Sequence, residues 1–137
     1  MSDKVDMYNA VETYVHLGPN GSAVPLQVTS TFWEDLTSGT FSSLGPGRLV
    51  STYDFKEDWS GWEKHPAGEE LVILLTGAMD FVLSVDGREE SVSLTSPGQY
   101  LIVPRDVWHT ANVPQGALAL FVTEGFIGRI SGRAYRF

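Results

Sequence analysis

The sequence predicts an all-β protein, either a sandwich or a closed barrel, on two observations. From Arg48 onward, short runs rich in β-branched and aromatic residues follow one another, separated by Gly, Pro or Asp-Gly turns. Helix signals are scarce, and only residues 29–36 have a helical pattern, with Ser30 or Thr31 as N-cap. We therefore expect one short helix in a chain that is otherwise built of strands.

Turn residues and apolar runs place the strands along the chain. The predicted strands are residues 49–55, 70–76, 78–85, 88–94, 99–103 and 118–123. Asp86-Gly87 is a tight hairpin turn between two of them. Residues 71–75 are apolar on both faces, so the outer face of that strand is expected to be covered by the N-terminal segment or a second subunit. Of the two, the sequence favours a homodimer.

Composition indicates one globular domain, residues 1–137, with 42% hydrophobic and 19% charged residues. No apolar stretch is long enough to span a bilayer, and the N-terminus lacks a secretory pattern, so a cytoplasmic protein is expected. The net charge of −8 argues against nucleic acid as a partner. Arg129, Arg133 and Arg136 near the C-terminus are expected to be solvated or paired with acidic neighbours.

Any metal site must use histidine and carboxylate ligands, because the chain has no cysteine. Glu63 and His65 are two residues apart and share a face of an extended strand. Glu70 opens the next strand, and antiparallel neighbours could bring it and His109 to the same pocket. Two imidazoles and two carboxylates suit Zn, Mn or Fe(II) better than Ca or Mg. His16 lies outside both segments and is expected to be structural.

These segments resemble the paired motifs of the cupin superfamily, G-x5-H-x-H-x3-4-E-x6-G and G-x5-P-x-G-x2-H-x3-N. Glu70 and Gly77 match the end of the first motif, with His65 as its second histidine. Gly98, Pro104 and His109 match the second motif. The resemblance covers residues 48–124 and leaves residues 1–47 as an N-terminal extension. It implies a double-stranded β-helix, also called a jelly roll.

The chain departs from the family pattern at several positions. Glu63 stands where the family has its first histidine, which would leave a Glu-His-Glu-His ligand set. Glu57 replaces the first glycine of motif one. In motif two, Asp106 replaces the glycine before the histidine, and Val113 occupies the final asparagine position, beside Asn112. Because a carboxylate also ligates metals, a metal site remains the expectation.

The resemblance implies a class of sites without selecting a reaction, because cupins include dioxygenases, isomerases, decarboxylases, hydrolases and non-catalytic binders. The first hypothesis is a metal-dependent enzyme with one divalent ion per chain, acting on a small organic molecule, with Glu63 as ligand or general base. The alternative is a binding or sensing module without turnover. Tyr53, Arg105 and Asp106 are candidates for the pocket. Trp59, Trp62 and Trp108 are expected to pack in the barrel wall or an interface. The less favoured alternative is that one or two of these aromatics line a pocket for a planar or sugar-like ligand.

Overall fold

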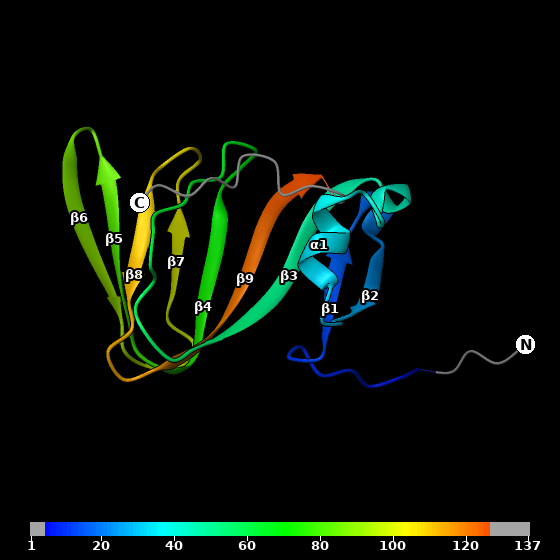
Figure 1. Cartoon of the computed structure of the whole chain (residues 1–137), viewed down its shortest axis with the longest axis horizontal. Coiled ribbons are helices and arrows are strands. Elements are labelled where there is room, and N and C mark those ends of the chain that lie inside the picture. The colour runs from blue at the N-terminus through cyan, green and yellow to red at the C-terminus, as the bar shows by residue number, and fades with distance from the viewer. Residues whose placement is uncertain (1–4, 127–137) are drawn as a thin grey trace, which may run out of the picture.

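The computed structural model describes the backbone of residues 5–126 and the side chains of residues 5–124, so Arg129, Arg133 and Arg136 lie outside the described part (Figure 1). Within it, nine strands, one α-helix and two 3-10 turns follow one another. They are β1 (Thr13–Leu17), η1 (Pro19–Gly21), β2 (Ala23–Gln27), α1 (Phe32–Thr37), η2 (Ser42–Leu44), β3 (Pro46–Phe55), β4 (Glu70–Gly77), β5 (Met79–Val85), β6 (Arg88–Leu94), β7 (Tyr100–Val103), β8 (His109–Asn112) and β9 (Ala117–Phe126).

The strands form two antiparallel sheets, which confirms the predicted all-β jelly roll. The larger sheet has the order β2-β1-β3-β9-β4-β7, and the smaller has the order β6-β5-β8. The main core lies between the sheets, where Val72, Leu74 and Phe121 of the larger sheet pack with Met79 and Phe81 of the smaller. A second core joins α1 to the other end of the larger sheet.

The Asp86-Gly87 turn is confirmed. Both residues have positive φ angles, 50° and 77°, and Val85 pairs directly with Arg88. Positive φ at both central positions is the geometry of a type I′ turn, whose twist matches that of the flanking strands. The hairpin therefore sets the register of β5 and β6 locally.

The N-terminal extension differs from the sequence expectation, because it contains β1 and β2 besides the predicted helix. These five-residue strands are held by pairing with each other and with β3, a non-local contact that their short pattern does not reveal. The helix also begins later than predicted, at Phe32, with Thr31 as its N-cap residue. Thr31 Oγ1 donates to Asp35 Oδ2 over 3.0 Å, so its hydroxyl does not cap the backbone.

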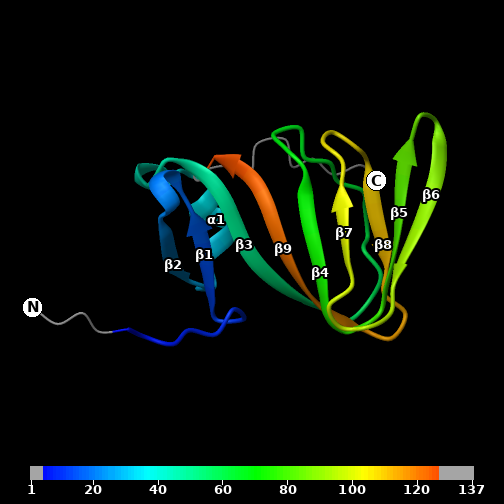
Figure 2. The same ribbon diagram turned by 180° about the vertical axis from the view of Figure 1, so that it is seen from behind.

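The described part of the extension, residues 5–47, does not cover the outer face of β4. Strands β1 and β2 continue the sheet beyond β3, at the far end from β7 (Figures 1 and 2). Helix α1 packs on the barrel-interior side, where Phe32 and Leu36 contact Tyr14 and Leu49. Within residues 5–126, no helix is long and apolar enough to cross a membrane.

Candidate metal centre

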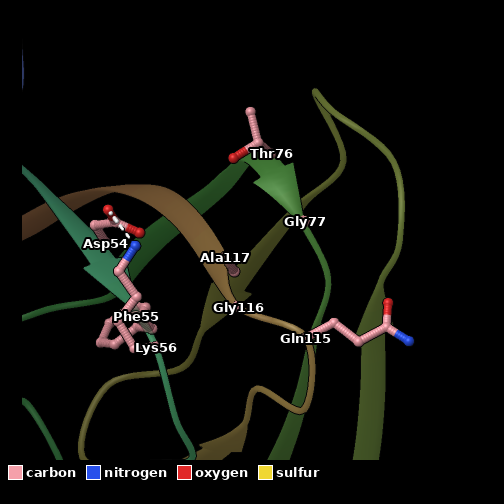
Figure 3. Close-up of a pocket in the computed structure, with 8 residues that line it drawn as sticks. All are labelled: Asp54, Phe55, Lys56, Thr76, Gly77, Gln115, Gly116 and Ala117. Atoms are coloured by element: carbon pink, nitrogen blue, oxygen red, sulfur yellow. Dashed lines mark hydrogen bonds and ion pairs between the residues drawn. The ribbon is translucent and has the colours of Figure 1, made fainter.

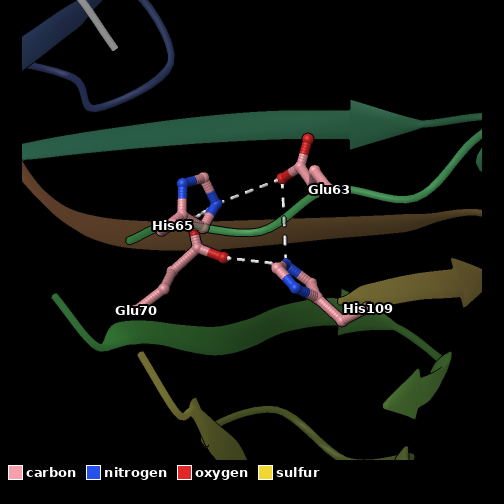
Figure 4. Close-up of side chains that lie close together, drawn as sticks. All are labelled: Glu63, His65, Glu70 and His109. Atoms are coloured by element: carbon pink, nitrogen blue, oxygen red, sulfur yellow. Dashed lines mark ion pairs between the residues drawn. The ribbon is translucent and has the colours of Figure 1, made fainter. Parts of the chain in front are cut away.

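The four residues proposed from the sequence lie together in the structure. Glu63, His65, Glu70 and His109 are all buried, and each offers one ligand atom within 4.8 Å of the others (Figure 4). They come from three separate stretches of the chain: the segment before β4, the first residue of β4 and the first residue of β8. The sequence spacing therefore identified a cluster that only the folded barrel assembles.

Backbone pairing explains why Glu63 and His109 meet. The amide of each residue donates to the carbonyl of the other over 2.9 Å, forming an isolated antiparallel bridge. Directly opposed residues in an antiparallel pair place their side chains on the same face. His65 is anchored nearby because the amide of Asp106 donates to its carbonyl over 3.1 Å.

Short contacts between unlike groups define the centre. His65 Nε2 lies 3.4 Å from Glu63 Oε1 and 3.3 Å from Glu70 Oε2. His109 Nε2 lies 3.9 Å from Glu63 Oε1 and 3.4 Å from Glu70 Oε1. Both imidazoles thus present Nε2 to both carboxylates.

Three of these atoms have no hydrogen bond of good geometry among the described residues: His65 Nε2, His109 Nε2 and Glu70 Oε1. Buried polar atoms are rarely left without a partner, and each such atom needs an explanation. Nitrogen and oxygen lone pairs that converge in this way are what a divalent metal ion requires. The donor set therefore fits a metal ion.

The tautomer of His109 follows from its second nitrogen. His109 Nδ1 lies 3.0 Å from the carbonyl oxygen of Val107. Because a carbonyl only accepts, neutral His109 carries its proton on Nδ1 and leaves Nε2 as a lone pair facing the cluster. Such a bond to the second nitrogen is typical of metal-ligating histidines.

The cluster also changes the proton affinity of its members. Burial disfavours the charged form of His65, but contacts with Glu63 and Glu70 outweigh it and raise its pKa to about 9. Burial likewise opposes ionisation of Glu70, but contacts with His109 and His65 lower its pKa to about 2. Without a metal, His65 and Glu70 therefore form a buried ion pair at neutral pH.

The structure adds two residues that the sequence analysis did not assign to the site. Thr123 of β9 pairs with Glu70 of β4, and its Oγ1 donates to Glu70 Oε2 over 2.9 Å. The ring of Trp59 lies against His109 with centroids 5.9 Å apart, and its buried Nε1 has no hydrogen-bond partner among the described residues. The contact of Thr123 could not be found from sequence because it depends on non-local strand pairing, whereas Trp59 was considered only as one of several aromatics that could line a pocket.

The three pocket candidates are spread over different environments. Tyr53 packs its ring against Trp33, Phe55 and Phe121 and is not part of the cluster. Arg105 is exposed. Asp106 is also exposed, and its Oδ1 lies 3.5 Å from Lys64 Nζ. Their role in binding a ligand stays a prediction.

A separate pocket lies at the other end of the strands from the metal cluster, where β3 and β4 end and β9 begins (Figure 3). It is lined by the end of β4 and the start of β9, together with Asp54, Lys56 and Gln115. Lys56 Nζ and Asp54 Oδ2 are 3.0 Å apart and both side chains are exposed. None of the metal-cluster residues or sequence-predicted pocket residues lines it.

Comparison with known proteins finds solved structures of similar fold but no family model and no curated relative. No protein-family model matches the chain, and a search of curated proteins finds no match. Among solved structures, the chain is similar to Co(II) HppE in complex with substrate (16% identity, 90% of this chain and 60% of that chain, TM-score 0.51). It is also similar to a double mutant of the QdtA 3,4-ketoisomerase from Thermoanaerobacterium thermosaccharolyticum in complex with TDP (21% identity, 56% of this chain and 58% of that chain, TM-score 0.50).

A third similar structure is a cupin-2 domain protein from Shewanella frigidimarina NCIMB 400 (14% identity, 57% of this chain and 71% of that chain, TM-score 0.49). This chain therefore spans about three fifths of the HppE and ketoisomerase chains. At these identities the likeness concerns the fold alone. The two antiparallel sheets and the similarity to the HppE and ketoisomerase structures confirm the jelly-roll fold that the cupin resemblance implied.

Proposed function

We propose that the protein binds one divalent metal ion through Glu63, His65, Glu70 and His109 and acts as a metal-dependent enzyme on a small organic molecule. The observation that carries this proposal is the convergence of four buried ligand atoms, three of which have no hydrogen bond to any residue that the structure describes. Zn, Mn and Fe(II) are the ions that such a mixed imidazole and carboxylate set suits.

The two carboxylates of the centre favour Mn among Zn, Mn and Fe(II). Glu63 stands where the cupin motif has histidine, so two carboxylates would balance the charge of one divalent ion. Carboxylate ligands suit Mn, whereas imidazole ligands suit Zn, Fe and Cu. A bound ion would supply Lewis-acid chemistry or, with Fe(II), oxygen chemistry. Of the chain's own groups, Glu63 would serve as ligand or as general base.

Trp59 supports the binding of a ligand beside the centre. Its indole N–H is buried against His109 and has no acceptor among the described residues. A buried donor without a partner is unfavourable by about 1–3 kcal/mol, which an oxygen atom of a bound molecule would relieve. We therefore expect the small molecule to present an oxygen acceptor to Trp59. Arg105 and Asp106 are proposed for the pocket mouth, on the turn that precedes His109.

The test is elemental analysis of protein purified without a His tag or chelating resin. We expect about one transition metal ion per chain in the wild type and a large loss in the His65→Ala, His109→Ala double variant. His16→Gln is the matched control, because His16 is also fully buried but belongs to β1, outside the cluster. Circular dichroism verifies that each variant folds. Equal metal content in the double variant and the wild type would disprove the assignment.

A non-catalytic binding barrel is the second candidate, and one observation favours it. His65 and Glu70 already form a buried ion pair without metal, since the pKa of His65 is raised and that of Glu70 is lowered. A folded wild-type protein that holds no metal, and regains none from added Zn, Mn or Fe(II), would establish this alternative. The search would then turn to organic ligands, with thermal stabilisation as the readout.

A further inference from the structure

One backbone pairing divides the side chains around the metal cluster between two faces. Glu63 and His109 form an antiparallel bridge, and both are buried among the proposed ligands (Figure 4). Continuing that register by one residue places Lys64 opposite Trp108. Because successive side chains of an extended chain point to opposite faces, Lys64 and Trp108 lie on the reverse side of the bridge, and both are partly exposed. We call this side the solvent face of the bridge.

Lys64 makes two contacts on the solvent face of the bridge. Its Nζ lies 5.0 Å from the centroid of the Trp108 ring, which is within the range of a cation–π interaction. The same Nζ lies 3.5 Å from Asp106 Oδ1. Asp106 is the diagonal neighbour of Lys64 in this register, and long side chains reach such neighbours. The three residues form a cluster that we call the Lys64 triad.

The Lys64 triad joins two segments that carry proposed ligands. Lys64 lies between Glu63 and His65 in the chain. Trp108 directly precedes His109, the first residue of β8. The segment of Glu63 and His65 lies between β3 and β4 and belongs to none of the described strands. Because such segments open locally more readily than strands do, contacts between this segment and the turn before β8 help to hold the ligands together.

The backbone of Asp106 gives a second, independent indication. Its φ angle is 63°, a left-handed conformation that favours glycine, and the cupin motif has glycine at this position. The amide of Asp106 donates to the carbonyl of His65 over 3.1 Å, a bond that glycine would also make. What aspartate adds is the carboxylate beside Lys64. An unfavourable backbone angle is often kept where the side chain has a function.

We propose that Lys64 is a positioning residue of the metal centre, which holds the segment of Glu63 and His65 against the start of β8 through the other two members of the Lys64 triad. Holding the ligands in place before an ion binds reduces the ordering that binding requires, so a preorganised site binds more tightly. The effect on metal rests on the proposed function, whereas the contact between the two segments is a property of the metal-free chain. The two can therefore be tested separately.

The first test measures how fast bound Zn is released to a chromophoric chelator. Lys64→Met keeps a long side chain without the charge and should speed the release by about tenfold, a factor of about 2–5 from each contact. Lys64→Arg keeps the charge and can stack on an aromatic ring, so its release rate should stay within about threefold of the wild type. Lys56→Met is the matched control, since Lys56 pairs with Asp54 outside the metal cluster.

Asp106→Gly separates positioning from general stability. Glycine adopts a φ angle of 63° without strain, so the free energy of unfolding in EDTA should equal that of the wild type or exceed it. Release of Zn should nevertheless be about threefold faster, because Lys64 loses one of its two partners. A residue that served stability alone would not make release faster while the free energy of unfolding is kept or raised. Unchanged Zn release in Asp106→Gly and Lys64→Met would overturn the proposal.

Amide hydrogen exchange in EDTA, measured by NMR, tests the contact between the segments without metal. The amides of Glu63 and His109 each donate to the other residue's carbonyl over 2.9 Å, so their exchange measures opening of the bridge. Lys64→Met should speed both by about tenfold, and Lys56→Met should not. Unchanged exchange in Lys64→Met would overturn the proposal, whatever metal the wild type holds. Faster exchange in a protein that binds no metal even as wild type would disprove the proposed function and support the contacts of Lys64.

Discussion

Thr123 holds Glu70 in place across two neighbouring strands. The two residues are directly opposed in β9 and β4, and the Thr123 hydroxyl donates to Glu70 Oε2 over 2.9 Å. Glu70 Oε1, which has no hydrogen bond within the described part of the chain, faces His109 Nε2 at 3.4 Å. The hydroxyl therefore occupies one carboxylate oxygen, and the other is the one that we propose for the metal ion.

Removing that hydroxyl should weaken metal binding without unfolding the barrel. Thr123→Val keeps the shape of the side chain but removes the donor, so we expect metal affinity to fall by about 10–100-fold, as for other outer-shell partners. Thr123→Ser retains the donor and should stay within about threefold of the wild type. Isothermal titration with Mn or Zn measures both variants. Equal metal affinities in the Thr123→Val and Thr123→Ser variants would show that Thr123 does not position Glu70.

Glu63 is the proposed ligand position at which this chain departs from the cupin motif. If Glu63 occupies the ligand position, Glu63→His should tighten Zn binding by about tenfold, because an added imidazole suits Zn. The backbone bridge to His109 does not depend on the side chain, so the substitution should not displace it. Glu69→His, at an exposed neighbour, is the control and should change nothing. Weaker Zn binding in Glu63→His would mean that Glu63 has another role.

Local signals predicted much of the fold and of the candidate site. The Asp86-Gly87 turn specifies its hairpin through the φ angles of two adjacent residues, and these are properties of the residues themselves. Gly77 ends the first cupin motif and Pro104 lies within the second, and the resemblance to these motifs is what placed Glu70 and His109 together. The hairpin was predictable because its interactions are close in sequence, and the cluster because the two motifs match a known arrangement.

The features that the sequence analysis missed depend on pairing between distant segments. Strand β8 has four residues, and its pairing with β5 and Glu63 is what makes it a strand. The contact of Thr123 with Glu70 follows from the register of β9 on β4, which includes an irregularity between Leu74 and Thr76. One bulge moves every later side chain relative to its neighbours, so no local pattern predicts this contact.

The opposite pKa shifts of His65 and Glu70 predict how stability varies with pH in EDTA. The pKa of His65 is raised from 6.5 to about 9, so its contribution is full below pH 6.5 and is lost as the pH rises through 9. The pKa of Glu70 is lowered from 4.5 to about 2, so its contribution is full above pH 4.5 and is lost as the pH falls through 2. From this pair alone, metal-free stability should be greatest between pH 4.5 and 6.5.

Metal binding should show the opposite dependence on pH. An ion must displace the proton of His65, so affinity should rise by up to about tenfold per pH unit until about pH 9. The measurement is the melting temperature between pH 6 and 9, with and without Mn. His65→Gln should flatten the metal-free profile across this range. A metal-induced shift that shrinks as the pH rises would contradict the assignment of His65 as a ligand.

Two separate effects favour glycine at position 77, the last residue of the first motif: its positive φ angle and the lack of space for a side chain. A comparison with Gly87 separates the two effects. Its φ angle is 82°, and an added Cβ would lie 2.3 Å from the carbonyl oxygen of Gly116. Gly87 has a similar φ of 77° but has no atom within 4 Å of such a Cβ. Gly87→Ala therefore measures only the cost of placing alanine at a positive φ angle, which should lower the free energy of unfolding by about 1 kcal/mol.

Gly77→Ala should lower the free energy of unfolding by about 1–3 kcal/mol more than Gly87→Ala does, which is the usual effect of overpacking. Urea unfolding of both variants, with EDTA present to remove any contribution from metal, gives the comparison. Equal losses would show that Gly116 moves away at little free-energy cost. In that case the left-handed backbone alone would account for glycine at position 77, and the close approach of β4 to the start of β9 would not constrain it.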